Sequence, residues 1–598
     1  MSQSPAAAAN EDIKIESLRW KRVLPGIGCA LSVALCVWLI HPALEMGTND
    51  DWSYIKTAQM FATTGHFVYN GWATAMLGWQ IPWGALFIKL FGFSFFAVRM
   101  STLPLAMASA YLFYVILLRF GISIQNAVFG TLVLALSPLS LPLTTSFMTD
   151  IPSVFAILVC LYCCLRVLAA KNDRSALLWL CVAAGSNVAL GTVRQIVWLG
   201  VLVMVPSTVW LVRRHRNLVV AGFLLWAISG IAIFLCLRWF AHQPYILPEK
   251  LIPGTINSRA VARSCFQMFR FALSVLLFSF PILVAWLPAI RNLRRTAWVK
   301  IGAILLLYIP ILVWGQKRGV LDHLIPPWLD NLVTKKGISQ FPAILGNQPN
   351  VLPLWLRLIL GFAVIAVALV AMATLTYEAR KDSTPAGGFG WRTALILLLP
   401  FTLANCALLL PRSLAFDLFD RYLLPVMIPA LILLLLAYER RFGNRLPAVS
   451  YATLALFTCF AVAGTHDEFA ISRARLQAVH QVLAAGVPRT AVSGGIEYDG
   501  WTQIEAQGYV NDPRLINPLG SYHAPVNAIR DCRRRNSFFV DYTPAVVPEY
   551  VVVYTPMPCL EPSGFLLIPY QTWMAPSHRV MYIQEESRST GNNQSPDQ

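Results

Sequence analysis

The sequence predicts a polytopic α-helical membrane protein with a small soluble α/β domain at its C-terminal end. Of the 598 residues, 57% are hydrophobic and only 13% are charged, which leaves too little polar surface for a water-soluble protein of this size. About thirteen apolar runs are long enough to cross a bilayer. The last part of the chain, 464–598, instead shows short β-rich runs separated by turn residues.

The apolar runs give the expected spans, because a helix needs about 20 mostly apolar residues to cross roughly 30 Å of hydrocarbon. They lie at 23–41, 97–118, 124–142, 151–169, 175–193, 195–212, 217–241, 271–290, 298–316, 353–377, 392–411, 420–438 and 447–463.

Small basic clusters follow every second run, and they determine the expected orientation. The formal net charge is +18, but a nucleic-acid-binding protein would collect that charge on one face or tail, so we expect no nucleic-acid partner. Clusters such as Arg213/Arg214/Arg216 are typical of loops that face the cytoplasm and anionic lipid headgroups. With a cytoplasmic tail at 1–22, an odd number of spans places 464–598 outside. The sequence thus predicts a multi-pass protein of the plasma (inner) membrane with a periplasmic, or otherwise extracytoplasmic, C-terminal domain.

Three predicted domains follow from this topology: the tail 1–22, the transmembrane domain 23–463 and the outer domain 464–598. The first outer loop, 42–96, contains WQIPWGALFIKLFGF, which is apolar but interrupted by proline, glycine and lysine, as in a helix that lies at the interface. No repeat of 20 to 50 residues is visible, which argues against an inverted-repeat transporter.

The outer domain begins with a helical pattern, HDEFAISRARLQAVHQVLAAG, and continues with the candidate strands RTAVSG, EYVVVYT, GFLLIPY and RVMYIQ. Ten of the twelve cysteines lie in or beside the apolar runs, where cysteine behaves as a small hydrophobe. The other two, Cys532 and Cys559, can form a disulfide in an oxidising compartment or remain two free thiols. The sequence leaves both possibilities open.

Acidic residues stand at the outer ends of neighbouring spans. Asp50 and Asp51, in GTNDDWSY, directly follow the first span, and Asp150, in SFMTDIPSVF, precedes another. Each could simply cap a helix, with Pro152 in the first turn in the case of Asp150. Two acidic sites at matching ends of neighbouring spans indicate instead one cavity that both face.

Arginines stand at outer ends as well: Arg194 in GTVRQIVW and Arg421 in FDRYLLP. An arginine so close to hydrocarbon is costly unless it faces a cavity or a partner, and is a functional candidate for that reason. The alternative is snorkelling to the headgroups, which needs no function. For Arg194, which lies in a very tight turn, the sequence favours a polar ligand.

Together these motifs resemble the GT-C membrane glycosyltransferases, especially the branch of protein O-mannosyltransferases and lipid A aminoarabinose transferases. The similarity rests on NDDWSYIKTAQMFATTGHF, TDIP and FDRYLLPVMIPALILLL in this order, and it covers residues 20 to 463 well and the tail only in outline. It implies the GT-C fold and a transfer of a monosaccharide from a polyprenyl-phosphate donor to an acceptor hydroxyl on a lipid, glycan or protein. A single displacement on the outer face would invert the anomeric centre.

The resemblance also implies residue roles. Asp50 matches the catalytic acid of the family's D-x-x-x-Y pattern with Tyr54 as its tyrosine, Asp51 matches a secondary position, and Asp150 matches the acid of the second loop. One carboxylate is enough as general base, because a phosphate ester leaves without protonation. Glycosidases differ in using a pair of carboxylates.

Two departures from the aminoarabinose branch remove positive charge near the expected donor phosphate: Ser53 replaces an arginine and Gln80 a lysine. The candidates that could supply this charge or line the donor site are Arg194, Arg421 with its neighbour Tyr422, and the pair Lys317 and Arg318. The last two begin the loop 317–352, KRGVLDHLIPPWLDNLVTKKG and onward. This loop suits an interfacial lid and ordinary interfacial packing equally well.

Other functions remain open at this level. A polymer ligase or polymerase acting on lipid-diphosphate glycans shares the many-span architecture, and a transporter or a non-catalytic scaffold is also compatible with it. Spans that are apolar inside and polar at their outer ends favour chemistry at the surface. No His, Cys or Glu cluster has convincing metal-ligand spacing, and no cofactor other than the lipid-linked donor is implied; the need for a divalent metal, the sugar and the acceptor are left open.

Overall fold

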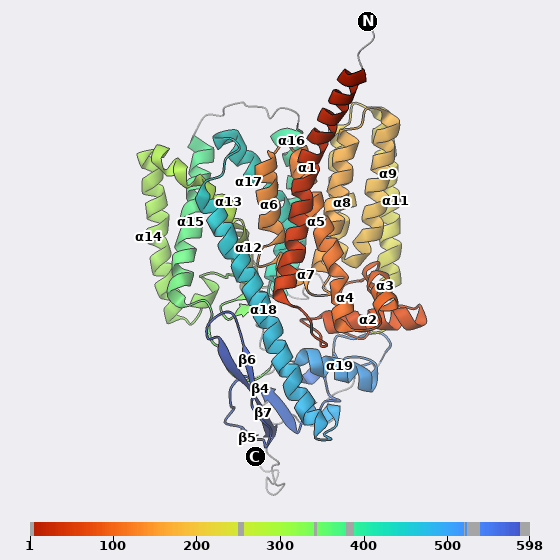
Figure 1. Cartoon of the computed structure of the whole chain (residues 1–598), viewed down its shortest axis with the longest axis vertical. Helices are drawn as coiled ribbons and strands as arrows, with labels where there is room; N and C mark the ends of the chain where they lie inside the picture. Colours follow the sequence, from red (N-terminus) through yellow and green to blue (C-terminus); the bar gives the residue numbers. More distant parts are fainter. Residues whose placement is uncertain are drawn as a thin grey trace.

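The computed structural model describes residues 5–248, 256–339, 344–377, 388–519, 521–522 and 539–586. It consists of a bundle of long helices with a small sheet at one end, hereafter the domain end (Figure 1). The N-terminus of helix α1 lies beyond the opposite end of the bundle (Figure 1). The principal bundle helices are α1 (Pro5–Ile40), α5 (Thr102–Arg119), α6 (Ile124–Ala135), α8 (Asp150–Leu168), α9 (Asp173–Leu190), α10 (Val205–Leu211), α11 (Arg216–Ala241), α12 (Ser258–Phe278), α14 (Arg295–Lys317), α15 (Leu354–Tyr377), α16 (Gly390–Ala415), α17 (Leu424–Phe442) and α18 (Ala448–Ala484).

The number of apolar segments agrees with the sequence prediction. Within the described residues, eleven helices are long and apolar enough to cross a membrane, and two shorter apolar segments accompany them, Ile124–Ala135 and Gln195–Leu211. These shorter segments correspond to the expected spans 124–142 and 195–212. The second of them is not a regular α-helix: a 3₁₀ turn (Gln195–Trp198) and a π turn (Gly200–Met204) precede α10.

One expected span, 271–290, is misplaced by about three helical turns. Helix α12 begins already at Ser258 and ends at Phe278, and the chain then continues as the short α13 (Phe280–Leu283) and a 3₁₀ segment (Val284–Asn292). The first half of α12 carries arginines and a glutamine, which hid it in the sequence. Two of these side chains bind the same carboxylate: Gln267 donates to Asp417 at 2.5 Å, and the exposed Arg263 donates to it at 3.0 Å.

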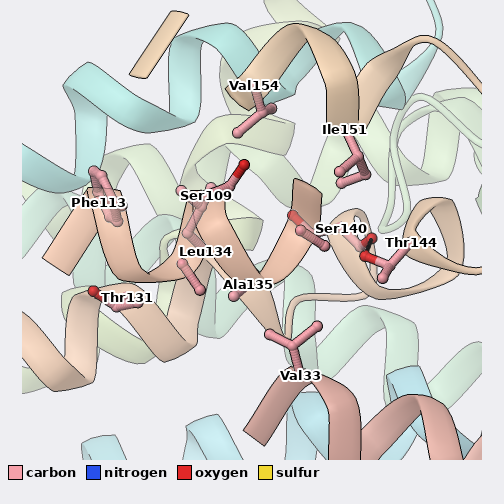
Figure 2. Close-up of a pocket in the computed structure, with 12 residues that line it drawn as sticks. Val33, Ser109, Phe113, Thr131, Leu134, Ala135, Ser140, Thr144, Ile151 and Val154 are labelled. Carbon is pink, nitrogen blue, oxygen red and sulfur yellow. Dashed lines mark hydrogen bonds between the residues drawn. The ribbon is translucent and has the colours of Figure 1, made fainter. Parts of the chain in front are cut away.

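The interior of the bundle is closely packed. Figure 2 shows a cavity of about 20 Å³ among α1, α5, α6 and α8, lined by apolar side chains and by hydroxyls. Ser109 and Thr131 donate these hydroxyls to carbonyls one turn earlier in their own helices, both at 2.7 Å. A space of this size holds about one water molecule. This cavity is therefore too small for a substrate.

Two short helices from the first loop lie across the domain end (Figure 1). They are α2 (Asp51–Thr64) and α3 (Gln80–Phe91), followed by α4 (Phe95–Met100). The interfacial helix predicted from WQIPWGALFIKLFGF corresponds to α3. Because α2 begins immediately after the turn that follows α1, the acids of the GTNDDWSY motif lie at the domain end of the bundle.

Helix α18 connects the bundle to the C-terminal domain. Its 37 residues span about 55 Å at 1.5 Å per residue, which exceeds the roughly 30 Å of bilayer hydrocarbon. The predicted domain boundary at 463/464 lies inside this continuous helix. Asp467 then fixes the domain to the helix, because its carboxylate accepts the backbone N–H groups of Trp573 and Met574 at 2.7 and 2.9 Å.

The C-terminal domain is a mixed α/β unit, as predicted. Strand β3 pairs with β4 in parallel, and β4, β5 and β6 each pair with β7 in antiparallel fashion. Cys559 is disulfide-bonded, whereas Cys532 lies outside the described residues. The elements of the domain are β3 (Val492–Ser493), α19 (Ile496–Gln507), β4 (Tyr550–Val553), β5 (Leu560–Pro562), β6 (Ile568–Gln571) and β7 (His578–Glu586).

Candidate active site

Asp50 occupies the N-cap position of α2, but its side chain forms no capping hydrogen bond. Its Oδ1 accepts a hydrogen bond from the indole Nε1 of Trp72 at 2.9 Å, and its Oδ2 accepts one from Nη2 of Arg421 at 3.3 Å. The side chain is 29% exposed. A carboxylate offers about four acceptor positions, so Asp50 retains the capacity to accept a proton from a ligand.

The neighbouring Asp51 has a different environment. Its carboxylate is fully buried and accepts from the backbone N–H and hydroxyl of Thr48, at 2.7 and 3.0 Å, and from the backbone N–H of Phe147 at 3.2 Å. Burial raises the pKa of Asp51 to about 6. Asp51 therefore joins the first loop to the segment that precedes Asp150, and it does not face the open side of the site.

Asp150 and Arg194 form an ion pair of 2.7 Å between Oδ1 and Nη1. The other oxygen of Asp150, Oδ2, is buried without a hydrogen-bond partner among the described residues. Arg194 lies between two 3₁₀ turns, Gly191–Val193 and Gln195–Trp198, in extended conformation. This backbone directs its guanidinium toward Asp150 and leaves it 24% exposed.

The motif FDRYLLP forms a 3₁₀ turn, Asp420–Leu423, at the start of α17. Asp420 is buried and accepts the backbone N–H of Leu332 at 2.9 Å and that of Val333 at 2.7 Å. It thereby attaches the loop 317–352 beside the site. This anchoring fixes the turn that presents Arg421 and Tyr422.

Two guanidinium groups lie close to the ring of Tyr422. Arg194 is 4.9 Å and Arg412 is 5.2 Å from the centre of its ring, within the range of cation–π attraction. Arg412, near the end of α16, is a site residue that the sequence analysis did not select. The argument applied to Arg194, an arginine at the end of an apolar run, would have found it.

Tyr54 completes the cluster from the first turns of α2 and is nearly buried. Burial raises its pKa; the negative charge of Asp50 acts in the same direction, while Arg421 and Arg194 oppose it. Tyr54 is thus within electrostatic range of both acidic sites and both predicted arginines. The structure brings together six of the predicted site residues: Asp50, Tyr54, Asp150, Arg194, Arg421 and Tyr422.

Lys317 and Arg318 lie elsewhere. Both are exposed at the end of α14, which forms the edge of the bundle far from α2 and α3 in Figure 1. The hydrogen bonds and ion pairs described above for the cluster involve neither of them. A role for these two residues stays a prediction.

Ser53 and Gln80, the positions where charge was expected from the family pattern, are fully buried. Ser53 donates to Oδ1 of Asn70 at 2.6 Å, and Gln80 donates to the carbonyl of Phe147 at 2.9 Å. Both side chains therefore stabilise the first loop from inside. The positive charge of the site comes from other elements, among them α16 with Arg412 and the 3₁₀ turn before α17 with Arg421.

The charges of the cluster favour an anion. Three guanidinium groups, those of Arg194, Arg412 and Arg421, accompany two carboxylates, those of Asp50 and Asp150, which leaves one net positive charge. Arginine forks match the oxygens of a phosphate. In the part of the chain that the structure describes, no three His, Cys, Asp or Glu side chains group so that they could hold a metal ion.

Fold and site together define a polytopic helical membrane protein with a polar, arginine-rich cluster at one end of the bundle. No protein-family model matches the chain. No curated protein matches it either.

Among solved structures, the chain is similar to ArnT from Cupriavidus metallidurans bound to undecaprenyl phosphate. The identity is 13% and the TM-score is 0.39, and the match covers 82% of this chain and 69% of that chain. It is also similar to the archaeal oligosaccharyltransferase AglB from Archaeoglobus fulgidus, with 13% identity, a TM-score of 0.37, and coverages of 78% and 59%. The match to the S. cerevisiae protein O-mannosyltransferase Pmt1-Pmt2 complex has 15% identity and a TM-score of 0.31, and spans 37% of this chain and 33% of that one. The chain thus has structural similarity to GT-C glycosyltransferases, as its motifs predicted. At these identities and TM-scores, the likeness assigns no substrate and no residue role.

Proposed function

We propose that this protein is a membrane glycosyltransferase that transfers a monosaccharide from a polyprenyl-phosphate donor to an acceptor hydroxyl. The observation that supports this function is the position of the Asp50 carboxylate beside a cluster of guanidinium groups. A base next to a cationic site is what the reaction requires, since a hydroxyl must lose a proton while a lipid phosphate departs.

In the proposed mechanism, Asp50 accepts the proton of the acceptor hydroxyl as its oxygen attacks the anomeric carbon. The new bond joins that oxygen to the anomeric carbon, and the bond from this carbon to the phosphate oxygen breaks. The electron pair of the broken bond leaves with the polyprenyl phosphate. One displacement of this kind inverts the anomeric centre.

The arginines have two tasks in this proposal. Arg421 donates to Asp50 and orients its carboxylate, while Arg194 and Arg412, both close to the ring of Tyr422, donate to the phosphate oxygens. Asp150 is a positioning residue, because it holds Arg194 through their 2.7 Å ion pair. Lys317 and Arg318, exposed at the end of α14, have no place in this set.

The proposed orientation places the domain end on the extracytoplasmic side of the plasma membrane. Helix α17 supports it, because it starts at the site and ends with Arg440 and Arg441 in its last turn. Basic residues at the end of the bundle opposite the site are expected on the cytoplasmic side. The donor lipid and the acceptor would then meet on the outer face.

The test is incubation of the purified protein in lipid nanodiscs with a panel of polyprenyl-phosphate sugars, with membrane lipid extract as the acceptor source. Mass spectrometry should detect free polyprenyl phosphate together with glycosylated product. A parallel panel of lipid-diphosphate glycans covers the ligase alternative. Turnover of the second panel alone, or of neither, would overturn the proposal, and an Asp50→Asn variant provides the inactive control.

A further inference from the structure

The C-terminal domain meets the first loop directly beside Asp50. The backbone N–H of Val510 donates to the carbonyl of Asn70 at 2.8 Å. Gly71 follows with a φ of +87°, and a side chain at this position would come within 2.9 Å of the carbonyl oxygen of Val510. Only glycine suits both constraints. The two segments are therefore in close backbone contact one residue before Trp72.

Three aromatic side chains meet at this contact. The ring of Trp72 lies 5.7 Å from that of Tyr542, nearly perpendicular at 84°, and 6.1 Å from that of Phe539. Trp72 also packs against the fully buried Trp52 at 5.3 Å. Trp72, Phe539 and Tyr542 are only half-buried, so each residue is partly exposed.

The position of Trp72 is determined by the candidate base. Its indole Nε1 donates to Oδ1 of Asp50 at 2.9 Å, which holds the indole in place. A backbone hydrogen bond also fixes Tyr542: the N–H of Asn511 donates to the carbonyl of Tyr542 at 3.1 Å. Trp72 thus lies at hydrogen-bond distance from the carboxylate, and the other two rings reach it through their contacts with Trp72.

Polar groups border this aromatic surface. Arg514 donates to the buried Asp512 through Nη2 at 2.6 Å, while half of its own side chain remains exposed. Arg514 interacts electrostatically with Tyr542 and also with Arg412 of the site. Arg514 therefore lies within electrostatic range of both the aromatic surface and the arginine cluster.

We propose that Trp72, Phe539 and Tyr542 form a saccharide-binding wall beside Asp50, built jointly by the first loop and the C-terminal domain. The C–H face of a sugar ring is apolar and packs on aromatic rings, while its hydroxyls need donors and acceptors at the rim, here Arg514 and Asp50. Pockets of this type combine aromatic walls with a few fixed polar groups. This inference rests on the proposed function and assigns to the C-terminal domain the recognition of the sugar.

The ring on this wall belongs to the donor sugar or to a saccharide acceptor, and binding measurements separate the two. Tyr542→Leu and Phe539→Leu remove the rings but keep apolar bulk. In full-length protein in nanodiscs, each should weaken binding of the sugar-bearing ligand about 3- to 10-fold, while polyprenyl phosphate without sugar binds as before. A changed donor Kd assigns the wall to the donor sugar. A changed acceptor KM at constant donor Kd assigns it to the acceptor.

Phe565→Leu is the matched control, because Phe565 is a half-buried aromatic of the same domain that packs on Tyr550 at 5.3 Å. It should leave both constants unchanged, and thermal unfolding shows whether each variant is folded. If Tyr542→Leu and Phe539→Leu, folded, change neither constant more than Phe565→Leu does, the wall is refuted.

A second readout needs no lipid donor. Saturation transfer by NMR from the aromatic protons of the wild-type protein to a panel of methyl glycosides should be observed, and it should be lost in Tyr542→Leu. Absence of transfer in the wild type contradicts the wall even if the enzyme turns over polyprenyl-phosphate sugars. Transfer without any turnover supports the wall and places the failure in the proposed reaction.

Discussion

Nη2 of Arg421 lies 3.3 Å from Oδ2 of Asp50, although 371 positions separate the two residues. This contact joins the turn after the first helix to the turn before α17, and it forms at the domain end of the bundle. The two motifs, GTNDDWSY and FDRYLLP, therefore lie at one site.

Asp50→Asn should abolish transfer while leaving the fold intact. The amide cannot accept the acceptor proton, and loss of a general base costs typically 10² to 10⁴-fold in rate. Donor Kd should change little, because the arginines are retained. The measurement is release of polyprenyl phosphate at equal folded protein, with Asp51→Asn as the adjacent control. If Asp51→Asn is inactive but well folded and Asp50→Asn is active, the base is Asp51.

Asp51 should make stability depend on pH. Burial raises its pKa from 3.8 to about 6, so the folded state holds this proton more tightly than the unfolded chain does. Its contribution is fully present below about pH 4 and is lost as the pH rises through about 6. The whole effect is at most about 3 kcal/mol.

The check is the thermal unfolding midpoint of wild type and Asp51→Asn between pH 4 and 8. Since asparagine does not titrate, the midpoint of the variant relative to wild type should rise between pH 4 and 6 and then stay level. A difference that is constant over this range would falsify the assigned pKa.

Arg194→Ala should weaken donor binding by more than about 10-fold, because it removes a charged fork from the phosphate and leaves Asp150 buried without its partner. Arg194→Lys should recover only part of this affinity, since a single ammonium replaces two-point contact. The measurement is donor titration at equal folded protein. Arg213→Ala, an exposed arginine that donates to the carbonyl of Trp210, is the control and should bind normally. A normal donor Kd for Arg194→Ala would leave Arg412 and Arg421 as the phosphate ligands.

Labelling should place Gly388 and Ser493 on opposite sides of the membrane. Gly388 precedes α16, and one crossing by α16, one by α17 and one by α18 separate it from Ser493 of β3. Because Ser493 is buried and a side chain at Gly388 would clash with the backbone of Gly121, the label is a reporter protein fused after each position that is active only outside the cytoplasm. Activity after Ser493 alone is expected for an extracytoplasmic C-terminal domain. Activity after Gly388 alone would reverse the orientation, and equal activity would show an even number of crossings.

Helix α12 shows why the bounds of a span could not be read from the apolar runs alone. Arginines and a glutamine interrupt the apolar run at its start, but the helix continues through them, and Arg263 and Gln267 both donate to Asp417. The arginine-rich stretch therefore resembled a loop. Whether such a stretch is helical depends on partners 150 positions away in the chain, which a local window does not contain.

The sequence by itself determined the membrane class, nearly all the spans, the short interfacial helix α3 and the mixed C-terminal domain, because these depend on local apolar length and periodicity. It also selected most of the charged residues of the site. The resemblance favoured Asp50 over Asp51, but only the tertiary structure shows that the two carboxylates have different environments. Successive side chains of a helix point about 100° apart. The carboxylate of Asp50 therefore faces Trp72 and Arg421. That of Asp51 is buried against Thr48 and Phe147. Long-range packing alone supplies the partners on each side, and these partners leave Asp50 partly exposed and Asp51 fully buried.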